Sequence, residues 1–142
     1  MERALIAVAL MAVAVVVAVV MARRRPEPPT QPAWTVPAQL DRRDFARPDA
    51  PWLVAVFTSA TCDTCAGVHA KAVALASEAV VVDEVEVGER PEDHRRYGID
   101  AVPTTVVADA EGVVRASFVG PVGASELWAA VAEVRDGPPE AT

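Results

Sequence analysis

The chain has 142 residues, of which 52% are hydrophobic and 23% charged, a size that suits one domain with accessory segments. Its formal net charge of −7 is unevenly distributed: 19 acidic but only 9 basic residues follow Arg25, which gives that part a net charge of −10. Such a surface repels phosphate backbones, so nucleic acid is excluded as an expected partner.

Residues 1–25 are predicted to form an N-terminal transmembrane anchor with a basic flank. Residues 4–22 contain only Ala, Val, Leu, Ile and Met, and a helix of these 19 residues would be about 28 Å long, close to a bilayer's hydrocarbon thickness. A cleaved signal peptide would begin with basic residues and end at a small-residue cleavage site. Here Glu2 offsets Arg3, and three arginines follow the run at 23–25. We therefore expect an uncleaved single-pass span that contacts the membrane through residues 4–22.

The arginines around this span predict its orientation. Three lie on its C-terminal flank against one on its N-terminal flank, which favours a cytoplasmic location for everything that follows. That compartment is reducing, so a cycling disulfide is expected there rather than a permanent one. Because the charge difference is small, an extracytoplasmic location stays as the alternative. Scarce lysine and abundant Ala, Val and Arg fit a bacterium with GC-rich codons, and hence the bacterial cytoplasmic membrane.

Residues 26–37 are predicted to be a Pro-rich linker. Five of these twelve positions are proline, which disfavours both helix and regular strand pairing and favours an extended spacer. At ~3.1 Å per residue, about ten such residues would hold a domain roughly 30 Å from the bilayer.

Residues 38–135 alternate strand and helix signals and are predicted to be the folded domain. The apolar run 52–57 predicts a strand covered on both faces. An Ala-rich stretch follows, with a helical stripe of Val68, Ala72, Leu75 and Ala79. The β-branched residues 80–87 predict a second strand, which ends at Gly88.

The second half of the domain is predicted to contain a short helix, a hairpin and a final helix. Pro91 begins the short helix, which extends to residue 97. Residues 104–108 and 113–119 are the strands of the hairpin, and 109–112 are its turn. Ser125 is expected to cap the last helix, whose inward residues are Leu127, Val131 and Val134. Residues 136–142 form a polar tail.

The two cysteines of the chain, Cys62 and Cys65, are separated by Asp63-Thr64. Thiols with this spacing, where a strand leads into a helix, form and break a disulfide with little movement of the chain. Since no third cysteine is present, sulfur chemistry is confined to this one place. A thiol–disulfide site is the leading hypothesis, although zinc sites also use this spacing.

The order of elements from residue 34 to residue 134 resembles the thioredoxin family. Pro103 stands 38 residues after Cys65, where that family has a cis-proline loop. The residues that carry the resemblance, besides the cysteines, are Tyr97-Gly98-Ile99, Val102-Pro103-Thr104, Gly112 and Val119-Gly120. The resemblance implies an α/β fold, a mixed central sheet flanked by helices, here preceded by one transmembrane helix.

The resemblance also implies roles for five residues. Cys62, at a helix N-terminus that stabilises the thiolate, would be the exposed catalytic nucleophile. Cys65, one turn further and more shielded, would attack Cys62 to release the partner. Val102, Pro103 and Thr61 would bind the substrate, with Val102 contacting its extended backbone. The partner would be a protein thiol or disulfide, and the redox-active disulfide would be the only cofactor.

Three departures from the family pattern favour a slower enzyme with a dedicated partner. Thr61 replaces a common tryptophan, and Val56 occupies the position of a buried acid six residues before the first cysteine. Asp63-Thr64 replaces Gly-Pro. The negative charge of Asp63 disfavours the Cys62 thiolate, whereas the hydroxyl of Thr61 or Thr64 could donate a hydrogen bond to the sulfur. The alternative to an oxidoreductase is a non-catalytic binding or redox-sensor module of the same fold, in which the two cysteines act as a redox switch or bind a metal.

The remaining polar residues are interpreted mainly as surface. His69, one turn after Cys65, is a candidate metal ligand or base, but we favour a half-exposed helix histidine. His94, among charged neighbours, is interpreted as solvated. Alternation sends Glu84 and Glu86 to one face of a strand and Asp83 to the other, so we interpret them as exposed edge charges. We predict no metal site.

Overall fold

The computed structural model describes residue 1, residues 11–17 and residues 34–137. The chain divides into two units, Met1–Ala33 and Trp34–Thr142. In the first unit, residues 11–17 are helical. No helix within the described ranges has both the length and the apolar character needed to cross a bilayer. The predicted span 4–22 extends past these ranges at both ends, and most of the linker 26–37 and of the tail 136–142 lies outside them.

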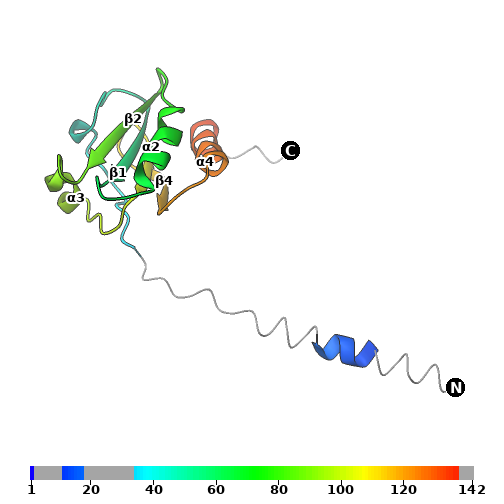
Figure 1. Ribbon diagram of the computed structural model, residues 1–142. Helices are drawn as coiled ribbons and strands as arrows, with labels where there is room; N and C mark the ends of the chain where they lie inside the picture. Colours follow the sequence, from blue (N-terminus) through cyan, green and yellow to red (C-terminus); the bar gives the residue numbers. More distant parts are fainter. Residues whose placement is uncertain (2–10, 18–33, 138–142) are drawn as a thin grey trace. The chain divides into compact units, whose positions relative to one another are not determined.

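The second unit contains a four-stranded mixed sheet with the order β2-β1-β3-β4 (Figure 1). β1 (Trp52–Thr58) pairs in parallel with β2 (Val80–Glu86) and antiparallel with β3 (Thr104–Ala108). β4 (Val114–Val119) pairs antiparallel with β3. The predicted mixed central sheet is therefore confirmed, and every predicted strand is present to within a residue at its ends.

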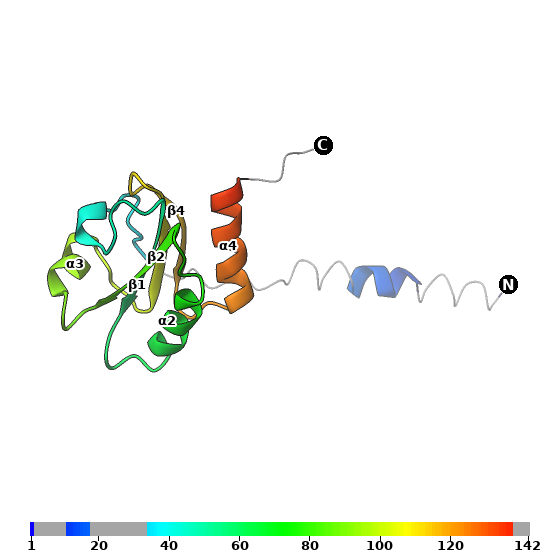
Figure 2. The same ribbon diagram turned by 90° about the horizontal axis from the view of Figure 1, so that it is seen from above.

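Helices cover both faces of this sheet. α2 (Cys65–Val73) and α4 (Ala124–Asp136) lie on one face, whereas α3 (Pro91–Arg96) and the 3₁₀ turn η1 (Arg42–Asp44) lie on the other (Figure 2). Two apolar cores result, and β1 contributes to both. Leu53 and Phe57 belong to the core beneath α3, and Val54 and Val56 to the core beneath α2 and α4. Successive side chains of a strand point to opposite faces, which explains the unbroken apolar run of β1.

The helix boundaries differ from the prediction at two places. α4 begins at Ala124 after an extended Gly123 and has no side-chain cap, so the prediction that Ser125 caps it is wrong. Ser125 is already the second residue of the helix, beyond the capping position. α2 ends at Val73, and Leu75 and Ala79 lie past it, because Ser77 forms a turn with the start of β2: its amide donates to Val80 O and its hydroxyl accepts from Val80 N.

His94 is buried, so its interpretation as a solvated residue is wrong. The residue is 6% exposed, its Nε2 lies 2.7 Å from Val85 O, and its ring packs edge-on against Phe57. α3 is a six-residue helix that presents one narrow face to the sheet. Position 94 falls on that face, while the neighbouring charges at 92 and 95 stay exposed. A histidine surrounded in sequence by charges can thus still be the inward residue.

Candidate active site

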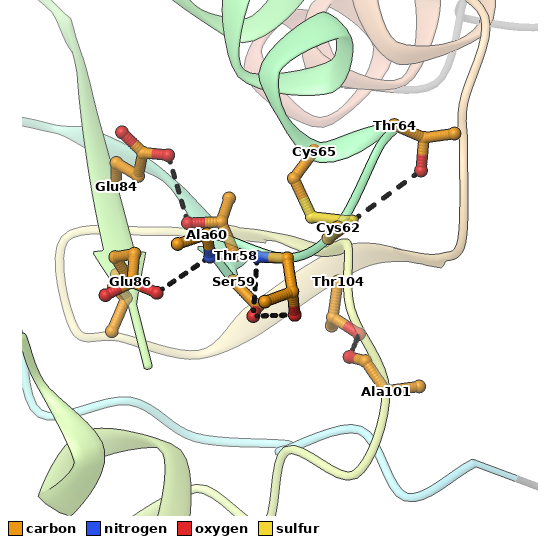
Figure 3. The surroundings of a disulfide bond; sticks show 12 residues. Thr58, Ser59, Ala60, Cys62, Thr64, Cys65, Glu84, Glu86, Ala101 and Thr104 are labelled. Atoms are coloured by element: carbon orange, nitrogen blue, oxygen red, sulfur yellow. Dashed lines mark hydrogen bonds between the residues drawn. A yellow bond between two sulfur atoms is a disulfide. The ribbon is translucent and has the colours of Figure 1, made fainter. Parts of the chain in front are cut away.

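Cys62 and Cys65 form a disulfide at the point where β1 leads into α2 (Figure 3). Their Cα atoms are 5.5 Å apart. β1 ends at Thr58, and the turn that follows is closed by two backbone hydrogen bonds, from Cys62 N to Ser59 O and from Cys65 N to Cys62 O. These bonds bring the two side chains together just before and at the first residue of the helix.

The two sulfurs differ in accessibility. Cys65 is 3% exposed, and Cys62 is half-buried. The N-cap residue Thr64 makes no side-chain capping bond, and the first turn of α2 holds no acid. The N-terminal amides of this helix, with the positive end of its dipole, therefore favour a thiolate on Cys62, which lies three residues before the first helical residue.

Of the two threonines considered as donors to sulfur, Thr64 is the one in contact. Its Oγ1 lies 3.8 Å from Cys62 Sγ, and either atom can act as the donor. Thr61 is exposed, and its hydroxyl instead pairs with Ser59 Oγ at 3.1 Å. Asp63, between the cysteines, is exposed.

The turn that contains Val102 and Pro103 lies beside the disulfide (Figure 3). The peptide bond between these two residues is cis. Thr104 Oγ1 donates to Ala101 O at 2.7 Å, and Gly120 N donates to Pro103 O at 2.7 Å. Gly120 has a φ of +91°, a backbone conformation that glycine adopts without strain. The start of β3 and the end of β4 thus hold this turn from both sides, and Val102 stays half-buried.

Glu86, at the end of β2, fastens the loop that carries Cys62. Its Oε1 accepts from Ala60 N at 2.9 Å, and its Oε2 accepts from Gly88 N and Glu89 N (Figure 3). The bond from Ala60, together with those from the other two amides, holds the pKa of Glu86 below its usual value. Glu86 is half-buried, so its interpretation as an exposed edge charge is wrong. Its partner lies 26 residues away, beyond any local signal.

Glu84 and Asp83 also have partners. Glu84 Oε1 accepts from the buried Thr58 hydroxyl at 3.0 Å, and Glu84 Oε2 lies 3.4 Å from His69 Nδ1. Asp83 Oδ2 accepts from Ala46 N and pairs with Arg90. The alternation prediction holds, because Glu84 and Glu86 contact groups near α2 and its preceding loop, while Asp83 contacts residues on the opposite side. The interpretation of His69 as half-exposed is confirmed, with 31% of its side chain exposed.

No protein-family model matches the sequence, and no curated protein matches it. Solved structures do match. The germline-specific thioredoxin Deadhead of Drosophila melanogaster has a TM-score of 0.54 and 26% identity over 61% of this chain and 84% of its own. Chloroplastic thioredoxin z has a TM-score of 0.54 and 19% identity over 63% and 81%. A malarial protein has a TM-score of 0.53 and 14% identity over 58% and 96%. The fold is thioredoxin-like.

Within this thioredoxin-like fold, position 56 provides no ionisable group. Val56 is fully buried among apolar side chains, in the core beneath α2 and α4. Titratable groups near α2 include the exposed Asp63 in the turn before it, His69 on the helix, and Glu84 on β2, which contacts His69. Among the residues that the structure describes, no three His, Cys, Asp or Glu side chains gather in a way that would hold a metal ion.

Proposed function

We propose that this protein is a thiol–disulfide oxidoreductase that exchanges disulfides with a protein partner through Cys62 and Cys65. The observation that carries the proposal is the asymmetric pair: an accessible sulfur three residues before α2 and a buried sulfur on the first residue of that helix, joined in a disulfide. The similarity to solved thioredoxins supports it.

The reaction follows from this asymmetry. In the reduced protein, the Cys62 thiolate attacks one sulfur of a partner disulfide, that disulfide breaks, and the sulfur that leaves takes up a proton. Cys65 then attacks Cys62 Sγ as a thiolate, the mixed disulfide breaks, and the partner leaves with its second thiol. The Cys62–Cys65 pair thus gives two electrons to the partner: the pair is oxidised to a disulfide, and the partner disulfide is reduced to two thiols. The reverse sequence oxidises a partner dithiol.

The turn beside the disulfide is the proposed substrate-binding element. Val102, before the cis proline, is half-buried, and we propose that it contacts the extended backbone of the partner. Pro103 offers no amide hydrogen next to the sulfurs. Thr61, exposed before Cys62, completes the proposed set.

We further propose that residues 4–22 tether the domain to a bacterial cytoplasmic membrane. The support is the uncharged apolar run, the three arginines that follow it and the Pro-rich segment 26–37. The arginines favour a cytoplasmic domain. An extracytoplasmic domain is the alternative, and protease protection of the folded domain in sealed inside-out and right-side-out vesicles would distinguish the two.

Replacing Cys65 with Ser tests the oxidoreductase proposal. The C65S variant should accumulate a covalent complex with its partner through Cys62, because the thiol that would release the partner is missing. The matched control is C62S, which keeps only the buried sulfur and should trap nothing. Non-reducing electrophoresis followed by mass spectrometry of the complex is the measurement.

The second candidate is a non-catalytic redox sensor. It is favoured by the buried, apolar Val56, which stands where the thioredoxin family often has a buried acid. A sensor would form the disulfide in glutathione buffers but trap no partner in C65S. A protein with no Cys62–Cys65 disulfide at any glutathione ratio would contradict both candidates.

A further inference from the structure

The buried Cys65 must lose its thiol proton before it can release the partner. It attacks the mixed disulfide only as a thiolate, and a free thiol is mostly protonated near neutral pH. Because Cys65 is 3% exposed, bulk water has little access to its proton. The side chains of Val56 and Val68, which belong to the core beneath α2, accept no proton. The proton must therefore leave through a titratable group at the edge of that core.

His69 occupies such a position. It lies four residues after Cys65 on α2, and side chains with this spacing share one helix face with Cβ atoms about 5–6 Å apart. A gap of that size between a thiol and an imidazole is spanned directly or by one water molecule. Partial exposure, at 31% of the side chain, gives the imidazole a route to solvent.

Glu84 and Thr58 fix the orientation of that imidazole. Glu84 Oε2 lies 3.4 Å from His69 Nδ1, and Glu84 Oε1 accepts a hydrogen bond from Thr58 Oγ1 at 3.0 Å. Thr58 is 1% exposed and is the last residue of β1, so the carboxylate is hydrogen-bonded to the buried end of an inner strand. With Nδ1 turned to the carboxylate, Nε2 is the nitrogen left to take a proton, and the carboxylate stabilises the imidazolium that results.

Of the other charged groups around α2, Glu86 and Lys71 have hydrogen-bond partners of their own. From β2, the Glu86 carboxylate is occupied by three backbone amides. On α2 itself, Lys71 Nζ donates to Val122 O at 3.0 Å, and from α4 the Trp128 indole donates to Lys71 O. Asp63, in the preceding turn, is exposed. Across the described part of the chain, Glu84 is the acid in contact with His69.

We propose that His69, oriented by Glu84 and Thr58, accepts the Cys65 proton in the step that releases the partner, an assignment that rests on the proposed function. The proton passes from Cys65 Sγ to His69 Nε2 as Cys65 Sγ bonds to Cys62 Sγ. The bond between Cys62 and the partner sulfur breaks, and the partner thiolate takes a proton back from the imidazolium. His69 is the proton acceptor, and Glu84 is a positioning residue.

The two steps can be timed separately with a chromogenic aromatic disulfide and the reduced full-length protein in a stopped-flow instrument. Attack by Cys62 releases one aromatic thiolate at a rate that depends on reagent concentration. Attack by Cys65 releases the second at a rate that does not. Wild type should show a second phase whose rate rises in a step as the pH is increased, because the imidazole accepts a proton only when it is neutral.

The variant His69→Asn should slow the second phase by roughly 100-fold near pH 7, the range expected for loss of a general base, and should remove that step of the pH profile. Glu84→Gln should slow it by a smaller factor. Both should leave the first phase within about twofold of wild type. The control Glu78→Gln, which changes the charge equally at an exposed residue, should alter neither phase.

A wild-type second phase with an unchanged pH profile in His69→Asn would overturn the assignment of the proton acceptor while leaving the oxidoreductase proposal intact. Release of only one aromatic thiolate by the wild-type protein would instead overturn the proposed function itself. Because both replaced side chains are more than 30% exposed, neither substitution empties the core.

Discussion

Glu86 shows how one carboxylate can organise a reactive loop. Its carboxylate accepts hydrogen bonds from three backbone amides, and one of these donors, Ala60 N, is two residues from Cys62. Those amides would otherwise need water or another acceptor, since an unpaired backbone donor is costly when shielded. The loop that carries the accessible cysteine is therefore held both by local backbone hydrogen bonds and by an acid on β2.

Replacing Glu86 with Gln should lower the thermal unfolding midpoint at pH 7. The folded-state pKa of Glu86 lies below its ordinary value of 4.5, mainly because of the Ala60 amide. Its contribution to stability is therefore fully present above that value and is lost as the pH falls through the folded-state pKa. The difference between wild type and E86Q should accordingly shrink on acidification.

The control for this experiment is Glu78→Gln, whose side chain is exposed. Calorimetry of both variants from pH 7 to acid would check the prediction. A midpoint difference for E86Q that stays constant with pH would mean that the charge of Glu86 contributes nothing to the loop.

At the scale of elements, the segment before β1 is held by a short antiparallel bridge between Gln39 and Val113 and by a buried guanidinium. Arg42, in η1, is 6% exposed. Its Nη1 donates to Ala50 O and to Asp109 O, each at 2.9 Å, and its Nη2 donates to Arg47 O. One side chain thus joins η1, the approach to β1 and the end of β3. The contacts of Arg42 are not marked by any pattern of apolar residues, so they could not be predicted from the sequence.

Replacing Arg42 with Met should lower the free energy of unfolding by about 2–4 kcal/mol, because two buried carbonyls lose their donor. Urea unfolding followed by circular dichroism is the measurement. Arg43 provides the matched control. Its side chain is 85% exposed and pairs with Asp41, so Arg43→Met should cost less than about 1 kcal/mol. Equal losses for the two variants would refute the structural role given to Arg42.

At the scale of the whole domain, the two apolar cores lie on opposite faces of the sheet and contain most of the buried side chains. Only one of the cysteines, Cys65, is buried. The disulfide closes a loop of only three residues' separation, so it constrains the unfolded chain little. The fold therefore depends on burial of the strands and helices and not on the redox state of the sulfurs.

Reduction of the disulfide should accordingly leave the domain folded, with a loss of about 2 kcal/mol or less in the free energy of unfolding. Urea unfolding with and without dithiothreitol would measure this loss, and the double variant C62S/C65S should be insensitive to the reductant. Unfolding of the wild-type protein on reduction alone would show that the folded state requires the disulfide.

The sequence predicted the strands well because β-branched runs such as 80–86 and 104–108 are local signals. It also predicted the positions of Cys62, Cys65 and the cis proline, through the resemblance to a known family. It did not predict the burial of His94 or the anchoring by Glu86. Both depend on which face of a short helix or strand end meets a partner far along the chain, and charged neighbours in the sequence obscure that choice.

The contact between Trp128 and α2 has an experimental consequence. The indole Nε1 donates to Lys71 O, in the last turn of the helix that begins with Cys65, while the ring stays 44% exposed on α4. A small displacement of that helix when the sulfurs separate would change the hydrogen bond and the hydration of a natural fluorophore. We therefore expect the fluorescence of Trp128 to differ between the oxidised and reduced protein, and the variant Trp128→Phe to remove that difference.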